Sequence, residues 1–223
     1  MKYKILILSI LCFIGGSLVT KISGQGVYTG KAWHDSIQVI PGKIQCEKYD
    51  TGGEGVAWHD VDSVNNGSGK LNPNDGTYFN TFRIHEGVDI SYTKPGGTDD
   101  NPYNKVKPEM KQLYVGWTTP GEWLKYTVEV KEDGYYEGEI MYTANSDGKI
   151  AIDLDGNSWL KPVLINSTFD TTEPIAWRQW HHWNKQIIFR SLKLEHGLHV
   201  LTLKTVEKGG MNYDFIEFTK VNK

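Results

Sequence analysis

Cysteine is scarce in this chain, and so are long helical patterns. Only two of its 223 residues are cysteines. Because Cys12 lies in a leader that we expect to be removed, Cys46 is left without an intrachain partner, which excludes a disulfide framework. After the first twenty residues the sequence is also poor in alanine and leucine. Stability therefore has to come from a packed core, together with any bound metal ion.

The one long apolar run stands at the N-terminus, in MKYKILILSILCFIGGSLVT. Lysines at positions 2 and 4 precede it, and KISGQG follows with small residues suited to cleavage after Gly24. This pattern predicts a signal peptide over residues 1–24 and a secreted or periplasmic protein. A lipid anchor at Cys12 is the alternative, although Leu11 stands where a small residue normally precedes a lipidated cysteine.

An excess of basic residues is missing as well. Removing residues 1–24 takes away three lysines and no acidic residue, which leaves 21 basic and 27 acidic residues and a net charge of −6. No basic stripe interleaved with aromatic residues is visible. Such a surface repels a phosphate backbone, so nucleic acid is excluded as a partner.

What is present is a series of short β-patterned segments separated by Gly, Asp or Asn. In EWLKYTVEV the alternation places Leu124 and Tyr126 on one face and Trp123 and Lys125 on the other. These segments predict an all-β, antiparallel β-sandwich. The strand segments from residue 112 onward are QLYVGW, EWLKYTVEV, YYEGEIMYTAN, KIAIDLDG, KQIIFRSLKL, LHVLTLKTV and MNYDFIEF.

The chain reads as one domain with additions. Residues 25–42 are expected to be an N-terminal extension, and residues 43–221 the sandwich. A polar segment without periodicity near 94–111, KPGGTDDNPYNKVKPEM, is expected to be a loop insertion at the surface.

The final strand, in GGMNYDFIEF, contains two residues that do not fit a core-facing pattern. Simple alternation puts Asn212 and Asp214 on the same face as Ile216 and Phe218. Burying an amide and a carboxylate is costly unless each has a partner. We therefore expect either a hydrated strand end or a specific partner for each side chain.

Asp214 gains a set of oxygen neighbours if the first and last strands are adjacent. The first predicted strand, KIQCEKYD, would then place Gln45 and Glu47 beside it. Two carboxylates and an amide oxygen are hard donors that suit Ca²⁺ better than Zn²⁺. The alternative is that all three are hydrogen-bonded polar residues at a strand edge.

Two tryptophans stand next to turn residues, where the chain reaches a loop end of the sandwich. Trp117 lies in YVGWTTPGEW and Trp177 in IAWRQWHHW. An exposed indole face packs against the C–H face of a sugar ring, and a nearby amide such as that of Asn212 binds hydroxyl groups. The pattern thus indicates a sugar clamp, although single tryptophans in a sandwich commonly belong to its core.

Several of these segments together resemble a family 6 carbohydrate-binding module. They are IQCEKYDTGGEGVAWHD, FRIHEGVDI, YVGWTTPGEWLKYTVEV, IAWRQW, LEHGLHVLTL and GGMNYDFIEF, in order over residues 40–220. The resemblance implies a jelly-roll sandwich with a structural calcium ion and no catalytic activity. Modules of this kind are often attached to bacterial polysaccharide-degrading enzymes.

The resemblance assigns roles to individual residues. Its aromatic clamp falls on Trp117 and Trp177, and its hydroxyl-binding amide on Asn212. Its metal ligands are the following: Gln45, Glu47 and Asp214. The chain departs from the family where Ile175 and Ala176 replace two glycines before Trp177, and where Trp117 replaces a frequent tyrosine.

Two other functional classes remain open. A glycoside hydrolase needs only two carboxylates at a fixed separation, and the candidates are Glu54, Asp60, Glu86, Asp89 and Glu122. No nucleophile elbow, Walker loop, HExxH or CxxC motif is present. A cell-envelope adhesion module that binds protein is the third class. The favoured prediction is a monomeric, non-catalytic binder of a polysaccharide or oligosaccharide that works beside degrading enzymes.

Overall fold

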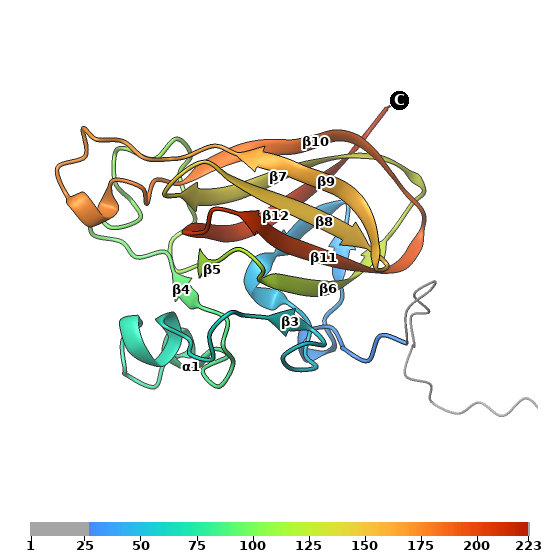
Figure 1. Cartoon of the computed structure of the whole chain (residues 1–223), viewed down its shortest axis with the longest axis horizontal. Coiled ribbons are helices and arrows are strands. Elements are labelled where there is room, and N and C mark those ends of the chain that lie inside the picture. Colours follow the sequence, from blue (N-terminus) through green and yellow to red (C-terminus); the bar gives the residue numbers. More distant parts are fainter. Residues whose placement is uncertain (1–26, 223) are drawn as a thin grey trace, which may run out of the picture.

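Two six-stranded sheets pack face to face in the computed structural model, which describes residues 27–222 (Figure 1). The predicted signal peptide over residues 1–24 lies outside the described residues. The all-β sandwich prediction is confirmed. The only α-helix of the described part is the four-residue α1 (Tyr78–Thr81), which lies in the small layer of loops beneath the sheets (Figure 1).

The first sheet has the order β1-β6-β11-β8-β9, and β3 also pairs with β6. Its pairs are antiparallel except for β1 and β6, which run parallel. The sheet therefore includes residues 38–40, which belong to the predicted extension over residues 25–42. Its strands are β1 (Gln38–Ile40), β3 (Trp58–His59), β6 (Trp123–Val130), β8 (Gly148–Leu154), β9 (Asn157–Ile165) and β11 (Gly197–Glu207).

The second sheet has the order β10-β7-β12-β5-β4, and β2 also pairs with β12. The first and last predicted strands are thus neighbours, as the sequence suggested, with Gln45 opposite Phe215. Its strands are β2 (Gly42–Gln45), β4 (Ile90–Tyr92), β5 (Leu113–Thr118), β7 (Gly134–Ala144), β10 (Asn184–Leu194) and β12 (Met211–Val221).

Short turns connect or extend the strands. Three are 3-10 turns and one is an irregular π-type turn; these are η1 (Trp33–Asp35), η2 (Cys46–Lys48), η4 (Ala176–Arg178) and the π-type η3 (Gly67–Leu71). The first predicted strand therefore ends at Gln45, and Glu47 lies in the turn η2.

The core forms where the inner faces of the two sheets meet. Strand β6 alternates strictly, with Leu124, Tyr126 and Val128 buried and the intervening residues half-buried. The buried side chains join those of β7, β11 and β12 in one apolar cluster. At about 25 cal/mol for each Å² of apolar surface removed from water, this cluster is the main source of stability.

A β-bulge in β12 overturns the simple alternation expected near the C-terminus. Tyr213 pairs with Tyr142 and Phe215 with Met141, so Asp214 is an extra residue without a partner in β7. The bulge puts Met211 and Tyr213 in the core beside Ile216 and Phe218. Asn212 therefore lies on the opposite, outer face of the sheet, and the prediction that it shares the face of Ile216 is wrong.

Strand β9 was not expected from the sequence. It is an edge strand, with mostly exposed or half-buried residues, so no clear alternation marks it. Its ladder to β8 shifts register between the Ile150–Val163 pair and the Ile152–Leu160 pair. Pro162 lies at this irregularity, a position that tolerates the missing N–H.

The 94–111 insertion packs onto the outer face of the second sheet. Val106 contacts a small apolar cluster made by Tyr114, Met141, Trp183 and Phe215. The backbone N–H groups of residues 105 and 106 both donate to the Trp183 carbonyl. The insertion thus has a defined structure and covers part of the outer face of this sheet.

No helix within residues 27–222 is both long and apolar enough to cross a membrane.

Candidate functional site

The predicted clamp residues come from three segments near one end of the sandwich. Trp117 lies near the end of β5, Asn212 near the start of β12, and Trp177 in η4 between β9 and β10. Figure 1 shows the loop that carries η4 reaching outward beyond the sheets, on the side where the insertion also lies.

Asn212 is buried and fully engaged with protein groups. Its side chain is inaccessible to solvent. The Oδ1 atom accepts the Trp117 N–H at 2.9 Å, and Nδ2 donates to Thr143 Oγ1 at 2.9 Å and to His181 Nδ1 at 3.0 Å. The structure therefore brings Asn212 and Trp117 together through the backbone of the tryptophan.

Trp117 adopts a backbone conformation that side-chain-bearing residues seldom take. Its φ angle is 46°, and the pairing of β5 with β12 changes register between Thr118 and Val115. An L-residue in this left-handed region costs about 1–2 kcal/mol. The hydrogen bond that the Trp117 N–H donates to Asn212 helps to hold this conformation, in which the Trp117 side chain is half-buried.

Trp177 is the most exposed aromatic side chain at this end, with 58% of its surface accessible. Phe169 and Ile175 on the same loop are also exposed, at 46% and 39%. No ring contact joins Trp177 to Trp117 among the described residues. The two indoles therefore do not stack on each other, and the predicted clamp stays a prediction.

A buried ion pair fixes the loop that carries Trp177. Arg178 donates from Nε and from Nη2 to the two carboxylate oxygens of Glu173, each at 2.9 Å, and Glu173 has no accessible surface. The remaining Arg178 nitrogen donates to the carbonyl of Gly97 in the insertion. A bidentate pair of this kind restrains the loop and holds Trp177 outward.

The predicted metal ligands also meet, at the junction of β2 and η2 with the bulge of β12. Glu47 and Asp214 are each 1% exposed. Gln112 Nε2 donates to Gln45 Oε1 at 3.3 Å and to Glu47 Oε1 at 3.2 Å. Two predicted ligand oxygens therefore converge on a single donor, and a cation could occupy such a position.

Two carboxylate oxygens in this group have no hydrogen-bond partner. They are Glu47 Oε2 and Asp214 Oδ1, both buried. Burial, with a contribution from the charge of Asp214, raises the pKa of Glu47 to about 8, and burial raises the pKa of Asp214 to about 7. Unpaired buried carboxylate oxygens are costly. The donor set, two carboxylates and an amide oxygen, fits a hard divalent cation.

Asp214 also faces a cavity of about 280 Å³ on the outer side of the second sheet. Gln45 lines it from β2, Gln112 from the residue before β5, and Lys107 and Glu109 from the insertion. Within residues 27–222 no group of three or more His, Cys, Asp or Glu side chains has metal-binding geometry. The predicted set contains only two such side chains, so its third ligand would be the Gln45 amide.

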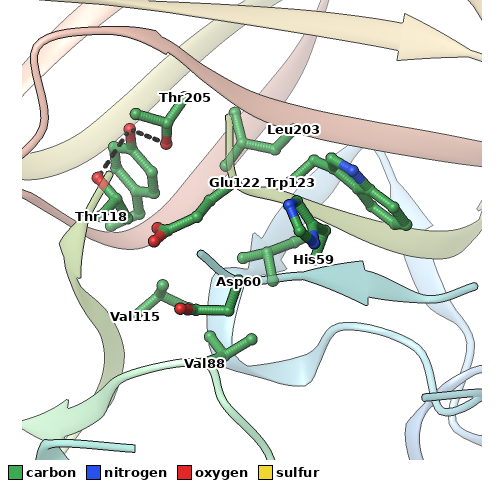
Figure 2. Close-up of a pocket in the computed structure, with 11 residues that line it drawn as sticks. His59, Asp60, Val88, Val115, Thr118, Glu122, Trp123, Leu203 and Thr205 are labelled. Carbon is green, nitrogen blue, oxygen red and sulfur yellow. Dashed lines mark hydrogen bonds between the residues drawn. The ribbon is translucent and has the colours of Figure 1, made fainter. Parts of the chain in front are cut away.

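A second carboxylate pair lies in a pocket between the β3 segment and the start of β6. Figure 2 shows the side chains of Asp60 and Glu122 entering the same space, with Val88 and Val115 beside them. Burial, together with neighbouring carboxylates, raises the pKa of Asp60 to about 6 and that of Glu122 to about 8. No sequence spacing predicts this convergence.

This pocket is too small for a sugar. Its volume is about 10 Å³, close to the minimum for one water molecule. Both carboxylates accept backbone N–H groups: Asp60 from Asp62 at 3.0 Å and Glu122 from Thr119 at 2.7 Å. The pair is therefore half-buried beside a space too small for a sugar ring and is bonded to its own loops, which does not favour catalysis on a glycan.

The other carboxylates considered for catalysis are held by protein partners. Glu54 pairs with His59, Glu86 with Arg83 at 2.8 Å, and Asp89 accepts the Asn66 N–H at 2.5 Å. These partners account for the positions of the three carboxylates without a catalytic role. None of the three lines the pocket shared by Asp60 and Glu122.

Comparison with known proteins finds one matching family. The family described as carbohydrate binding module (family 6) matches residues 89–220. No curated protein matches the chain significantly.

Three solved structures illustrate the matches. The C-terminal family 6 module of a marine laminarinase from Zobellia galactanivorans is 17% identical, with 80% of this chain and 98% of that chain covered and a TM-score of 0.44. A β-1,3-glucan-binding family 6 module from Bacillus halodurans is 18% identical, with coverages of 82% and 98% and a TM-score of 0.46. A family 6 module from Clostridium stercorarium in complex with cellobiose is 15% identical, with coverages of 83% and 98% and a TM-score of 0.46.

Proposed function

Because the chain belongs to carbohydrate-binding module family 6, we propose that it binds a polysaccharide or oligosaccharide without catalysis, through the aromatic residues at its loop end. The observation that carries the proposal is the exposed indole of Trp177 on a loop anchored by the buried Glu173–Arg178 pair. A rigid aromatic platform loses little conformational entropy when a ligand binds.

The two tryptophans would contact different parts of the ligand. Trp177 offers an open indole face for a sugar ring, and Trp117 offers a half-buried one. The polarised C–H groups of a pyranose face pack on such rings, as other flat ligands do on exposed aromatic side chains.

Asn212 has a supporting role in this proposal. Its amide already makes three bonds to protein, so a direct bond to a sugar hydroxyl requires it to give up one of them. Its contribution in the free protein is to hold the backbone of Trp117. Direct hydroxyl binding by Asn212 stays a prediction.

A structural calcium ion is the second element of the proposal. Gln45, Glu47 and Asp214 would hold it, and the ion would neutralise two carboxylates that otherwise lack partners. This would tie the first strand, η2 and the last strand together, far in sequence but adjacent in the sheet. Its role is stabilisation of the fold that carries the loops.

The setting of the protein follows from the same proposal. A secreted or periplasmic location, or a lipid anchor at Cys12, would place it where polysaccharides are degraded. It would act there as a monomer beside polysaccharide-degrading enzymes and would keep its glycan within their reach.

Affinity electrophoresis through gels that contain soluble polysaccharides tests the binding proposal. We expect residues 25–223 to be retarded by at least one glycan, and Trp177→Ala to lose most of that retardation, since each stacked ring contributes about 1–3 kcal/mol. Tyr78→Ala is the matched control, because Tyr78 is 57% exposed but lies on α1. Equal retardation of all three proteins would contradict the proposed site.

The enzyme alternative is tested in the same samples. Incubation with each polysaccharide should release no reducing sugar. Release that Glu122→Gln abolishes would move the function to the Asp60–Glu122 pocket.

A further inference from the structure

A chain of buried hydrogen bonds connects the 94–111 insertion to the backbone of Trp117. Asp99 Oδ1 lies 2.7 Å from His181 Nε2, and His181 Nδ1 lies 3.0 Å from Asn212 Nδ2. Asn212 Oδ1 accepts the Trp117 N–H at 2.9 Å. Asp99, His181 and Asn212 are at most 6% exposed, so water does not compete for these bonds.

The direction of each bond in this chain is fixed. A backbone N–H can only donate, so the oxygen of Asn212 must face Trp117 and its nitrogen must face His181. His181 Nδ1 therefore accepts, and the ring proton sits on Nε2, where it is donated to Asp99. Only one histidine tautomer and one amide orientation satisfy every group.

Asp99 is itself held in place from several sides. Its Oδ1 atom also accepts the Trp183 indole N–H at 2.7 Å, and its Oδ2 atom accepts the backbone N–H of Lys94 at 2.7 Å. The Asp99 carboxylate thus connects the start of the insertion, at Lys94, to Trp183 on the outer face of the second sheet. A displacement of the insertion would be transmitted to His181.

The last link of the chain ends at a strained residue. Trp117 has a φ angle of 46°, and Thr143 is the only other side chain bonded to the Asn212 amide within the described residues. If His181 did not hold the amide nitrogen, Asn212 could rotate away and release the Trp117 N–H. The indole would then be free to leave its position.

We propose that Asp99 and His181 are positioning residues of the glycan site, which act through Asn212 on Trp117 without contacting the ligand. The 94–111 insertion is therefore part of the binding machinery of this protein, in addition to covering the sheet. This inference rests on the proposed function, because it takes Trp117 to be a glycan contact.

Three variants separate positioning from simple packing. His181→Leu removes both bonds of the ring, whereas His181→Gln keeps one acceptor for Asn212 and one donor for Asp99. His199→Leu is the matched control: His199 lies on β11 in the first sheet, where its ring also makes two hydrogen bonds, to Asp155 and to the Glu195 carbonyl.

Binding is measured by titration with the polysaccharide that retards the wild-type chain most strongly. We expect His181→Leu to weaken binding by roughly fivefold, the size of one net hydrogen bond, and His181→Gln to restore most of it. His199→Leu should bind like the wild type. Equal losses in His181→Leu and His199→Leu, or no loss in either, would overturn the proposal.

Hydrogen exchange of the Trp117 backbone amide, followed by NMR, tests the chain of buried hydrogen bonds without any glycan. We expect slow exchange in the wild type and in His199→Leu, and exchange faster by roughly fivefold or more in His181→Leu. Asp99→Asn serves if His181→Leu does not fold, because its amide nitrogen meets a donor at either His181 or Lys94. Unchanged exchange in the folded variant would overturn the positioning role.

The two measurements keep the proposals distinguishable. If the wild-type chain binds no polysaccharide, the proposed function fails, and the amide exchange alone decides whether His181 holds Trp117. If glycan binding is present but insensitive to His181, only the positioning role fails.

Discussion

Two pairs of carboxyl groups in this molecule have raised pKa values, and the two pairs differ in what surrounds them. Glu47 and Asp214, at the β2–β12 junction, have pKa values of about 8 and about 7. Glu122 and Asp60, in the pocket of Figure 2, have pKa values of about 8 and about 6. Burial is the leading cause in all four.

The difference lies in the individual oxygen atoms. Glu122 and Asp60 each accept a backbone N–H from their own loop. Glu47 and Asp214 each keep one buried oxygen without any partner. A raised pKa thus reports burial in both places, whereas the unpaired oxygens single out the first pair as the candidate cation site.

Calcium removal should separate the two pairs most strongly. At a free calcium concentration about 100–1,000 times its Kd, the ion stabilises the fold by about 3–4 kcal/mol, so excess chelator should lower Tm by about 5–15 °C. Asp214→Asn should not respond to calcium, while Glu122→Gln should respond like the wild type. The measurement is thermal unfolding with and without chelator.

An unchanged melting curve in chelator, for protein stripped of metal beforehand, would remove the calcium proposal. A calcium response lost in Glu122→Gln but kept in Asp214→Asn would move the cation to the other pair.

The pH dependence of stability gives the next largest effect. All four carboxyls have folded pKa values above the value of about 4 that they take in the unfolded chain. Between these limits the folded state binds more protons, so the metal-free protein should lose stability as pH rises from about 4 to about 8. Urea unfolding at a series of pH values in chelator checks this slope.

Calcium should cancel the part of this slope that comes from Glu47 and Asp214, because metal binding competes with protons for the carboxylates. The slope that remains with saturating calcium should then come from the other carboxyls whose pKa burial raises, which are Asp60, Glu122, Asp50 and Asp89. If calcium leaves the slope of stability against pH unchanged, Glu47 and Asp214 do not bind the ion, and the two carboxyl pairs behave alike.

The smallest effect is expected from neutralising one member of the partnered pair. Glu122→Gln keeps an oxygen for the Thr119 N–H and removes the repulsion with Asp60. At pH 8 it should therefore be as stable as the wild type or more so, by up to about 1 kcal/mol. At pH 4 the difference should vanish, and urea unfolding at both pH values measures it.

A loss of stability in Glu122→Gln at pH 8 would show that the carboxylate has a favourable partner there. The comparison between the two pairs would then no longer hold.

Much of the fold follows from local patterns in the sequence. Strands such as β6 alternate cleanly because one face is buried and the other is not. The adjacency of the first and last strands is confirmed, whereas the use of Gln45, Glu47 and Asp214 as metal ligands stays a prediction. Strand β9 escapes prediction because an edge strand with Pro162 carries no such alternation.

The candidate site is less accessible to prediction, because it depends on contacts between distant segments. The bulge at Asp214 changes the face of Asn212, and no residue type signals it. The contact between Asp99 and His181 joins an insertion to a loop 82 residues away. The convergence of Asp60 and Glu122 likewise arises only when the β3 segment packs against β6.

Strand β9 also bears on how the molecule behaves at high concentration. An exposed sheet edge offers unpaired N–H and C=O groups to any neighbouring chain, and so invites edge-to-edge aggregation. On β9 the exposed Lys161 and Pro162 interrupt that edge with a charge and a missing donor, where the register already shifts. Pro162, which obscures the strand pattern in the sequence, thus also disfavours edge-to-edge pairing between copies of the folded protein.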